Sequence, residues 1–196
     1  NHKQIGVDVA RYGDNKTVLT YREGPVVKAA ISYGQRETME TVGLVVKFMK
    51  EFGCPQTMVD VDGVGGGVVD RLLELGYNNV FGIHNNGTPH DKEQYRNIRA
   101  EAAWGLRERF EESNISLLPV ARQFPQYAAQ AASIKWKVTS SGIQLETKEE
   151  MMKRKVPSPD YFDSLSLAFL KKPVSKLITK TEAEAPLTAG FQTKVF

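Results

Sequence analysis

The sequence contains few of the residues that form disulfides or bind soft metals. Its 196 residues include one cysteine, Cys54, and three histidines that show no metal-ligand spacing. This composition excludes an internal disulfide framework and a cysteine-rich zinc site, and a lone thiol fits a reducing compartment. We expect Cys54 to be a core thiol and the histidines to be ordinary, with His84 an outside candidate for the site described below.

Long apolar runs are also missing. No stretch reaches the roughly 18 apolar residues of a membrane-spanning helix, so we expect no membrane partner. The first residues show neither the basic nor the apolar region of a signal peptide. The chain begins with Asn1 and not with Met, which we interpret as a piece cut from a longer polypeptide. The net charge of +3 permits a nucleic-acid partner without requiring one.

The spacing of apolar residues predicts an α/β chain whose first half is built around strands. Three strands joined by tight turns predict an antiparallel meander, and helices then alternate with single strands. The strands are expected over 4–11, 17–22, 26–33, 56–61 and 79–83, and the helices over 38–52, 68–75 and 92–112. Thr38 is the expected N-cap of the first helix, and Gly53 ends it. Ile98, Ala102, Leu106 and Phe110 form the expected buried stripe of the third helix.

The second half adds a hairpin between helices. We expect an extended piece over 115–119, a hairpin over 134–147, and helices over 124–132, 147–153 and 160–170. This order of elements is typical of a ribonuclease H-like fold, with a mixed central sheet flanked by helices and an auxiliary β-hairpin. The actin-like ATPase fold shares the same beginning and is the alternative. Residues 1–172 are the expected domain, and 173–196 are an expected flexible tail.

Several aspartates lie inside apolar runs, where a carboxylate must be paired, metal-bound or otherwise satisfied. Asp8 and Asp60 belong to predicted strands, and Asp163 belongs to the last helix. Asp62 shares a strand face with Asp60, and Asp160 shares a helix face with Asp163. Structural alternatives stay open for three of them. Asp8 can cap a turn, Asp62 can cap the next helix, and Asp160 can stabilise a helix start.

Clustered carboxylates of this kind favour a divalent metal site. Like charges in an apolar frame repel each other, and a bound cation removes the conflict. Mg²⁺ and Mn²⁺ are hard cations that take carboxylate oxygens. Two such ions about 3.5–4 Å apart can activate water and stabilise the leaving oxygen of a phosphodiester. The aspartates therefore predict a site for two divalent cations, Mg²⁺ or Mn²⁺.

Four segments, in this order along about residues 4–170, resemble the nuclease domain of large terminase subunits from tailed bacteriophages of the headful type. They are GVDVARYGDNKTV (6–18), VDVDGVGGGVVDRL (59–72), YRNIRAEAAWGLRER (95–109) and KEEMMKRKVPSPDYFDSLSLAF (148–169), of which the last is the most specific. The resemblance implies an endonuclease that cuts concatemeric viral DNA during packaging, with two metals and low sequence specificity. By the same resemblance Asp8, Asp60 and Asp163 are the catalytic aspartates, with Asp62 the competing second ligand and Asp160 a possible fourth.

The resemblance also implies partners and a location. Terminases of this kind carry an N-terminal packaging ATPase domain and work with a small terminase subunit and a portal protein, in the cytoplasm of the infected host. The sequence has no G-x-x-x-x-G-K-[ST] motif, so the motor is absent from this chain. Two alternatives remain: an actin-like ATP-binding phosphotransfer domain, which the lack of a second similar domain disfavours, and a non-catalytic module that docks on the portal.

Basic residues on several elements are expected to contact double-stranded DNA through its phosphates. They are Arg96, Arg99, Lys135, Lys137, Lys153, Arg154 and Lys155. For Arg96 and Arg99 a solvated helix face is an open alternative. Lys135 and Lys137 share one face of a predicted strand, and Trp136 lies on the other face, where we expect it to pack against the protein.

Overall fold

The computed structural model describes residues 2–10 and 15–171, and these contain a five-stranded mixed sheet. The strands are β1 (Lys3–Asp8), β2 (Thr17–Glu23), β3 (Val26–Tyr33), β4 (Gln56–Asp60) and β5 (Val80–Ile83), in the spatial order β3-β2-β1-β4-β5. The first three strands are antiparallel, which confirms the predicted meander. β4 and β5 run parallel to β1, so their carboxyl ends meet at one edge of the sheet.

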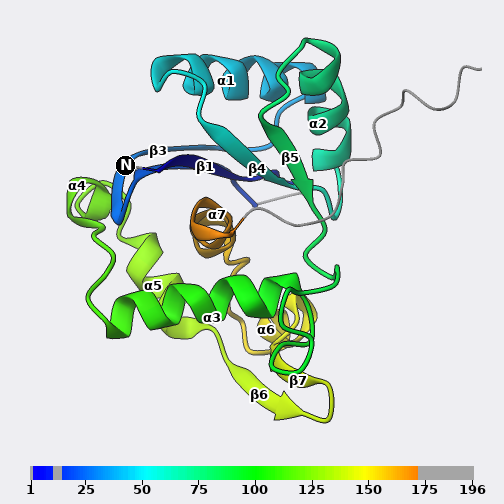
Figure 1. The fold of residues 1–196 in the computed structure, drawn as a ribbon, viewed down its shortest axis with the longest axis vertical. Coiled ribbons are helices and arrows are strands. Elements are labelled where there is room, and N and C mark those ends of the chain that lie inside the picture. Colours follow the sequence, from blue (N-terminus) through cyan, green and yellow to red (C-terminus); the bar gives the residue numbers. More distant parts are fainter. Residues whose placement is uncertain (1, 11–14, 172–196) are drawn as a thin grey trace, which may run out of the picture.

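Helices cover both faces of the sheet (Figure 1). α1 and α2 lie on one face; α7 lies against the other, with α3 and α5 beyond it. The hairpin projects at the far end of the molecule from α1. The bounds are α1 (Thr38–Glu51), α2 (Gly65–Glu74), α3 (Ile98–Glu111), α4 (Leu118–Ala121), α5 (Gln126–Ser133), α6 (Lys148–Lys153), α7 (Asp160–Phe169), β6 (Trp136–Thr139) and β7 (Gly142–Leu145).

The central helix α7 is buried along its whole length, because it lies between the sheet and the outer helices. Gly6 of β1 makes this close packing possible. A Cβ atom at Gly6 would overlap the Ser164 carbonyl oxygen and the Ala168 amide nitrogen. The Ser164 hydroxyl donates to the Gly6 carbonyl at 3.0 Å, so the first turns of α7 are held directly on β1.

The long helix α3 starts later than the sequence predicts. We expected it from residue 92, but it begins at Ile98, where the Asn97 side chain accepts a hydrogen bond from the Ala100 amide. The residues before it pair instead with the hairpin, through a bridge between Tyr95 and Ile143. This pairing partner lies far along the chain, so local periodicity cannot reveal it.

Other local expectations were also wrong. Phe110 was placed in the buried stripe of α3 but is 39% exposed, and Cys54 was expected in the core but is exposed. The expected extended piece over 115–119 is interrupted by the start of α4 at Leu118. Glu37, and not Thr38, is the N-cap of α1.

The predicted capping box of α6 is confirmed, since Thr147 and Glu150 bond each other's backbone amides. The predicted hairpin is confirmed as well. The expected tail over 173–196 lies outside the described residues. Within the described part of the chain, no helix has both the length and the apolar character needed to span a membrane.

Candidate active site

Carboxylates from three elements gather where β1 and β4 end. Val7 and Val59 are paired in the parallel ladder, so the next residues, Asp8 and Asp60, leave the two strands side by side. Asp163 lies in the first turn of α7, which packs on β1. Asp8, Asp60 and Asp163 are 4%, 9% and 2% exposed. The three aspartates that the sequence singled out therefore lie in one buried region, where the charges of Asp163 and Asp60 act on Asp8.

Asp60 is held by hydrogen bonds to both of its carboxylate oxygens. Its Oδ1 accepts from the Asp62 amide at 2.8 Å, and its Oδ2 accepts from the Asn85 side chain at 2.9 Å. Gly65 allows α2 to start directly against this strand end, because a Cβ there would overlap the Asp60 carbonyl oxygen. Asn85 was not among the predicted site residues, and no local pattern marks it.

Asp62 lies next to Asp60 but is exposed and has different partners. Its Oδ1 is 3.0 Å from His84 Nδ1, and its Oδ2 accepts from the Asn86 amide at 3.3 Å. The N-cap of α2 is Val64, without a side-chain cap, so the interpretation of Asp62 as a helix cap was wrong. His84, which the sequence suggested as a minor candidate for the site, lies at its rim, because it contacts Asp62.

Asp160 binds the segment before β2. Its Oδ2 accepts a hydrogen bond from the Lys16 amide at 2.6 Å. Burial raises the pKa of the Asp160 carboxyl, and the Lys16 amide opposes this effect by stabilising the charged form. Asp160 therefore has a structural partner in addition to its place beside the other carboxylates.

Two cationic side chains contact Asp163. The Lys148 Nζ atom lies 3.4 Å from Oδ2, and the Arg99 Nε and Nη2 atoms each lie 3.3 Å from Oδ1. Asp163 Oδ2 is buried and has no hydrogen-bond partner among the described residues. The Arg99 side chain is only 13% exposed, so the alternative of a solvated face was wrong for this residue. Lys148 was missed because its sequence position marks only the start of a helix.

The electrostatics of the group reflect its burial. Burial raises the pKa of Asp8 well above its usual value, and the carboxylates of Asp163 and Asp60 raise it further, although Lys148 opposes them. Burial and Asp163 likewise raise the pKa of Asp60, against the effect of the Asp62 amide. Burial alone would lower the pKa of Lys148, but Asp8 and Asp163 more than offset this, and the pKa is raised. Lys148 is thus a firmly charged counterion for the cluster.

Two hollows meet at these residues. A small pocket of about 40 Å³, the carboxylate pocket, is lined by Asp8, Asp60, Asp62, Asp160 and Lys148. A larger groove of about 420 Å³, the outer groove, runs between residues 85–99 and 144–149. Asp60, Asp62 and Lys148 line both hollows. Lys148 therefore stands between the buried carboxylates and the open groove.

The donor set has the chemistry of a hard divalent cation site, since carboxylate oxygens predominate and Asp163 Oδ2 is buried without a hydrogen bond. A pocket of about 40 Å³ is larger than the roughly 10–15 Å³ that one water needs. Among the described residues, no three acidic, histidine or cysteine side chains are drawn together into a preformed metal-binding group. The ammonium group of Lys148 provides positive charge to the cluster in this arrangement.

The predicted basic residues are distributed around the site unequally. Arg96 and Arg99 both line the outer groove. Arg154 is engaged internally, because its Nη2 lies 2.5 Å from Glu146 Oε1 and also donates to the Ser133 carbonyl. Lys135, Lys137, Lys153 and Lys155 are exposed on the hairpin and at the end of α6.

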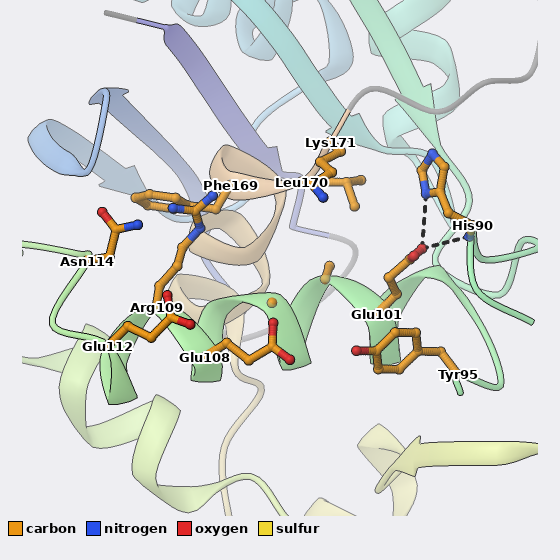
Figure 2. Close-up of a pocket in the computed structure, with 12 residues that line it drawn as sticks. His90, Tyr95, Glu101, Glu108, Arg109, Glu112, Asn114, Phe169, Leu170 and Lys171 are labelled. Carbon is orange, nitrogen blue, oxygen red and sulfur yellow. Dashed lines mark hydrogen bonds and ion pairs between the residues drawn. The ribbon is translucent and has the colours of Figure 1, made fainter. Parts of the chain in front are cut away.

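A separate pocket of about 290 Å³ lies between α3 and the end of α7 (Figure 2). His90 faces Glu101 across it, with Nδ1 3.1 Å from Oε2, and Arg109 lies over the Phe169 ring at 5.2 Å. None of the aspartates of the carboxylate pocket lines it. The pair with Glu101 gives His90 an ordinary structural role.

Comparison with known proteins identifies the fold. No family model and no curated protein matches the sequence. The nuclease domain of the large terminase subunit gp2 of bacterial virus Sf6 matches with a TM-score of 0.78 at 20% identity, over 88% of this chain and 89% of that chain. The large terminase nuclease of thermophilic phage G20c has a TM-score of 0.63 at 13% identity, over 86% and 81%. The nuclease domain from Thermus phage P74-26 has a TM-score of 0.60 at 13% identity, over 86% and 78%.

The matched structures have a ribonuclease H-like fold, so the predicted fold class is confirmed. The resemblance deduced from the sequence is confirmed at the level of the fold. Structures of the Sf6 domain, as a K428A mutant, contain manganese or calcium, and structures of the G20c nuclease contain magnesium or cobalt. At these identities the likeness concerns architecture, and the chemistry of this chain must be argued from its own residues.

Proposed function

We propose that this chain is a metal-dependent DNA endonuclease domain. The observation that carries the proposal is the proximity of buried Asp8, Asp60 and Asp163, from two strands and a helix, in a ribonuclease H-like fold. Asp8 and Asp60 line the carboxylate pocket, and the charge of Asp163 raises the pKa of both. Like charges that are gathered and buried in this way destabilise a protein unless a cation is bound. The solved structures with this fold include terminase nucleases that contain Mg²⁺ or Mn²⁺, which supports the assignment.

In this proposal Asp8, Asp60 and Asp163 hold the metal ions, and Asp62 and Asp160 border the site. Bound divalent cations supply the activation of water and the stabilisation of the leaving oxygen during phosphodiester hydrolysis. Asn85 keeps the Asp60 carboxylate oriented, and Arg99 does the same for Asp163. Lys148, which contacts Asp163 and lines both hollows, would keep a positive charge at the mouth of the carboxylate pocket.

The outer groove is the path that we propose for the DNA backbone. It opens onto Asp60 and Lys148, and Arg96 lines its wall. Contacts to phosphates position a nucleic acid without reading its bases. The predicted contacts of Lys135, Lys137, Lys153 and Lys155 are of the same kind, and Arg154 contributes by holding Glu146 in place. Cleavage should therefore show little sequence preference.

The biological setting that we propose is the one implied by the resemblance to terminase nuclease domains. We propose that the domain cuts concatemeric viral DNA during genome packaging, in the cytoplasm of the infected host. A packaging ATPase domain, a small terminase subunit and a portal protein are its proposed partners. The proposed domain comprises residues 1–172, followed by the segment 173–196. The large terminase subunits named among the solved structures support this setting.

A plasmid-nicking assay tests the proposed activity. The domain is incubated with supercoiled plasmid and Mn²⁺ or Mg²⁺, with and without EDTA, beside the folded Asp163→Asn variant. We expect nicked and linear DNA with either metal, with Mn²⁺ the more effective because Mg²⁺ demands near-ideal octahedral geometry. EDTA and Asp163→Asn should both abolish cleavage. Cleavage that survives both would disprove the metal-dependent mechanism.

A further inference from the structure

A second groove, outside the carboxylate site, lies between the hairpin and α6. This tryptophan groove has a volume of about 300 Å³ and is lined by Lys135, Trp136, Lys137, Glu146, Glu150, Lys153 and Arg154. Trp136 is 47% exposed although it packs against the protein, so only part of the sequence expectation for it is met. A large aromatic ring that stays open to solvent in a groove with lysines is suited to a ligand that is both flat and anionic.

Trp136 is held firmly enough to serve as a binding platform. The Trp104 ring of α3 packs perpendicular to it, with ring centroids 4.9 Å apart and an interplanar angle of 87°. The Arg107 guanidinium lies 4.4 Å from the Trp104 ring and 5.4 Å from the Trp136 ring. These contacts restrict the indole before any ligand arrives, which lowers the entropy cost of stacking on it.

The charged side chains around the groove differ in whether they form ion pairs. Arg154 and Glu146 neutralise each other in a close ion pair. Lys137 forms an ion pair with Glu150, with 3.6 Å between Nζ and Oε1, and both side chains are about half exposed. Lys135 and Lys153 are exposed on the two sides of the groove. The groove is therefore cationic at its rim, with lysines that can reach phosphate groups.

The tryptophan groove adjoins the outer groove. Glu146 lines both, at the point where β7 leads into Lys148. The hairpin is fixed to the wall of the outer groove by backbone bonds, from the Ile143 amide to the Gln94 carbonyl at 2.8 Å and from the Arg96 amide to the Ile143 carbonyl at 3.0 Å. A DNA strand that followed the outer groove away from the carboxylate pocket would therefore reach the tryptophan groove next.

We propose that the tryptophan groove binds an unpaired DNA strand, with a base stacked on Trp136 and phosphates at Lys135, Lys137 and Lys153. Bases of an intact duplex are already stacked on each other and cannot offer a free face to an indole, so the ligand is single-stranded. Aromatic stacking with lysines along the backbone is the general mode of binding single strands without sequence preference. That the ligand is DNA rests on the proposed nuclease function, and the groove then holds a strand that has separated near the cut.

Tryptophan fluorescence in EDTA tests the inference apart from cleavage. The chain has two tryptophans, so Trp104→Phe leaves Trp136 as the single reporter while keeping an aromatic edge beside it. Titration with oligothymidylate should quench the fluorescence of this variant to saturation. A duplex of equal length should produce much weaker quenching. Equal quenching by the duplex, or no quenching by the single strand, would overturn the proposal.

Variants measured by fluorescence anisotropy of a labelled oligothymidylate identify the contacts. Trp136→Leu should weaken binding about 5- to 150-fold, because loss of base stacking costs about 1–3 kcal/mol and 1.4 kcal/mol is a factor of ten. Trp136→Phe should retain most of the affinity. Lys135→Ala with Lys137→Ala should reduce the salt slope by about 0.7 per lost phosphate contact. Equal affinity of Trp136→Leu and wild type would show that the aromatic ring takes no part.

Two controls separate the possible failures. Lys47→Ala with Lys50→Ala removes the same charge from α1, at the other end of the molecule from the hairpin, and should leave binding unchanged. Displacement of the oligonucleotide by polyglutamate at similar concentration would instead identify an acidic peptide as the ligand class and would overturn the proposal. If the wild-type domain binds the single strand but does not cleave plasmid DNA, only the proposed nuclease function is contradicted. If it cleaves plasmid DNA but does not bind the single strand, only the proposed role of the tryptophan groove is contradicted.

Discussion

Replacement of Asp8 by asparagine should separate the activity of the domain from its stability. Asp8 is 4% exposed, and the carboxylates of Asp163 and Asp60 raise its pKa in addition to the effect of burial. Asparagine keeps the shape of the side chain but removes the charge and one metal-binding oxygen. In the absence of metal the variant should therefore be more stable than the wild type, and in the presence of Mn²⁺ it should cleave DNA much more slowly.

The pH dependence follows from the sign of the pKa shift. An aspartate in the unfolded chain has a pKa of about 3.9, whereas the pKa of Asp8 in the folded protein is raised. Between these two values the folded state binds more protons than the unfolded state, so the free energy of unfolding falls as pH rises. In EDTA the wild type should lose thermal stability as the pH rises above about 4, and Asp8→Asn should lose less. Asp60 and Asp160, whose pKa values are also raised, keep part of the dependence in the variant.

The magnitudes follow from burial and from the role of the metals. An unsatisfied buried polar group lowers the free energy of unfolding by roughly 1–3 kcal/mol. The neutral amide of Asp8→Asn should restore about 1–2 kcal/mol of this loss. In a domain of this size that corresponds to a rise in Tm of about 2–8 °C at pH 7.5. Metal ions contribute several kcal/mol to stabilising a transition state, so loss of their ligand should lower the cleavage rate by roughly 10³-fold.

Differential scanning calorimetry in EDTA and plasmid cleavage with Mn²⁺ measure the two effects on the same preparations. Addition of Mn²⁺ should raise the Tm of the wild type at pH 7.5 and should have little effect on Asp8→Asn. A folded Asp8→Asn protein with full activity would show that Asp8 does not hold a metal. A lower Tm for the metal-free variant than for the wild type would show that the carboxylate is already satisfied within the fold.

Two further substitutions test the roles of Lys148 and Gly6. Lys148→Ala removes the cation beside Asp163. It should tighten binding of Mn²⁺ to the DNA-free domain by about tenfold or more, equivalent to roughly 1.4 kcal/mol. Unchanged affinity in calorimetric titration would mean that the ammonium group does not compete with the metal ion for Asp163. Gly6→Ala forces α7 away from β1 and should lower the free energy of unfolding in urea by roughly 3 kcal/mol. The matched control is Gly105→Ala in α3, whose added Cβ would meet no atom within 4 Å. This variant should be neutral or stabilising by up to about 1 kcal/mol. Equal decreases in the free energy of unfolding for the two variants would contradict the packing argument.

Local sequence patterns were sufficient to predict most of the secondary structure. β3 spans Val26–Tyr33, the range expected between two turn signals, and α6 begins with the predicted capping box. These features depend on neighbours within a few residues of each other. The fold class followed from the order of the elements, and Asp8, Asp60 and Asp163 were conspicuous because a carboxylate within an apolar run needs a partner.

Tertiary structure decided which residues meet at the site. Lys148 and Arg99 contact Asp163, and Asn85 contacts Asp60, although each pair is separated by 15 to 64 residues along the chain. The start of α3 was set by pairing with the hairpin, which overrode the helical pattern of the preceding residues. Arg154 resembled a DNA contact in the sequence, yet its guanidinium is bound to Glu146. Periodicity reports which face of an element is buried, whereas the partner of a buried charge is determined by how separate elements pack.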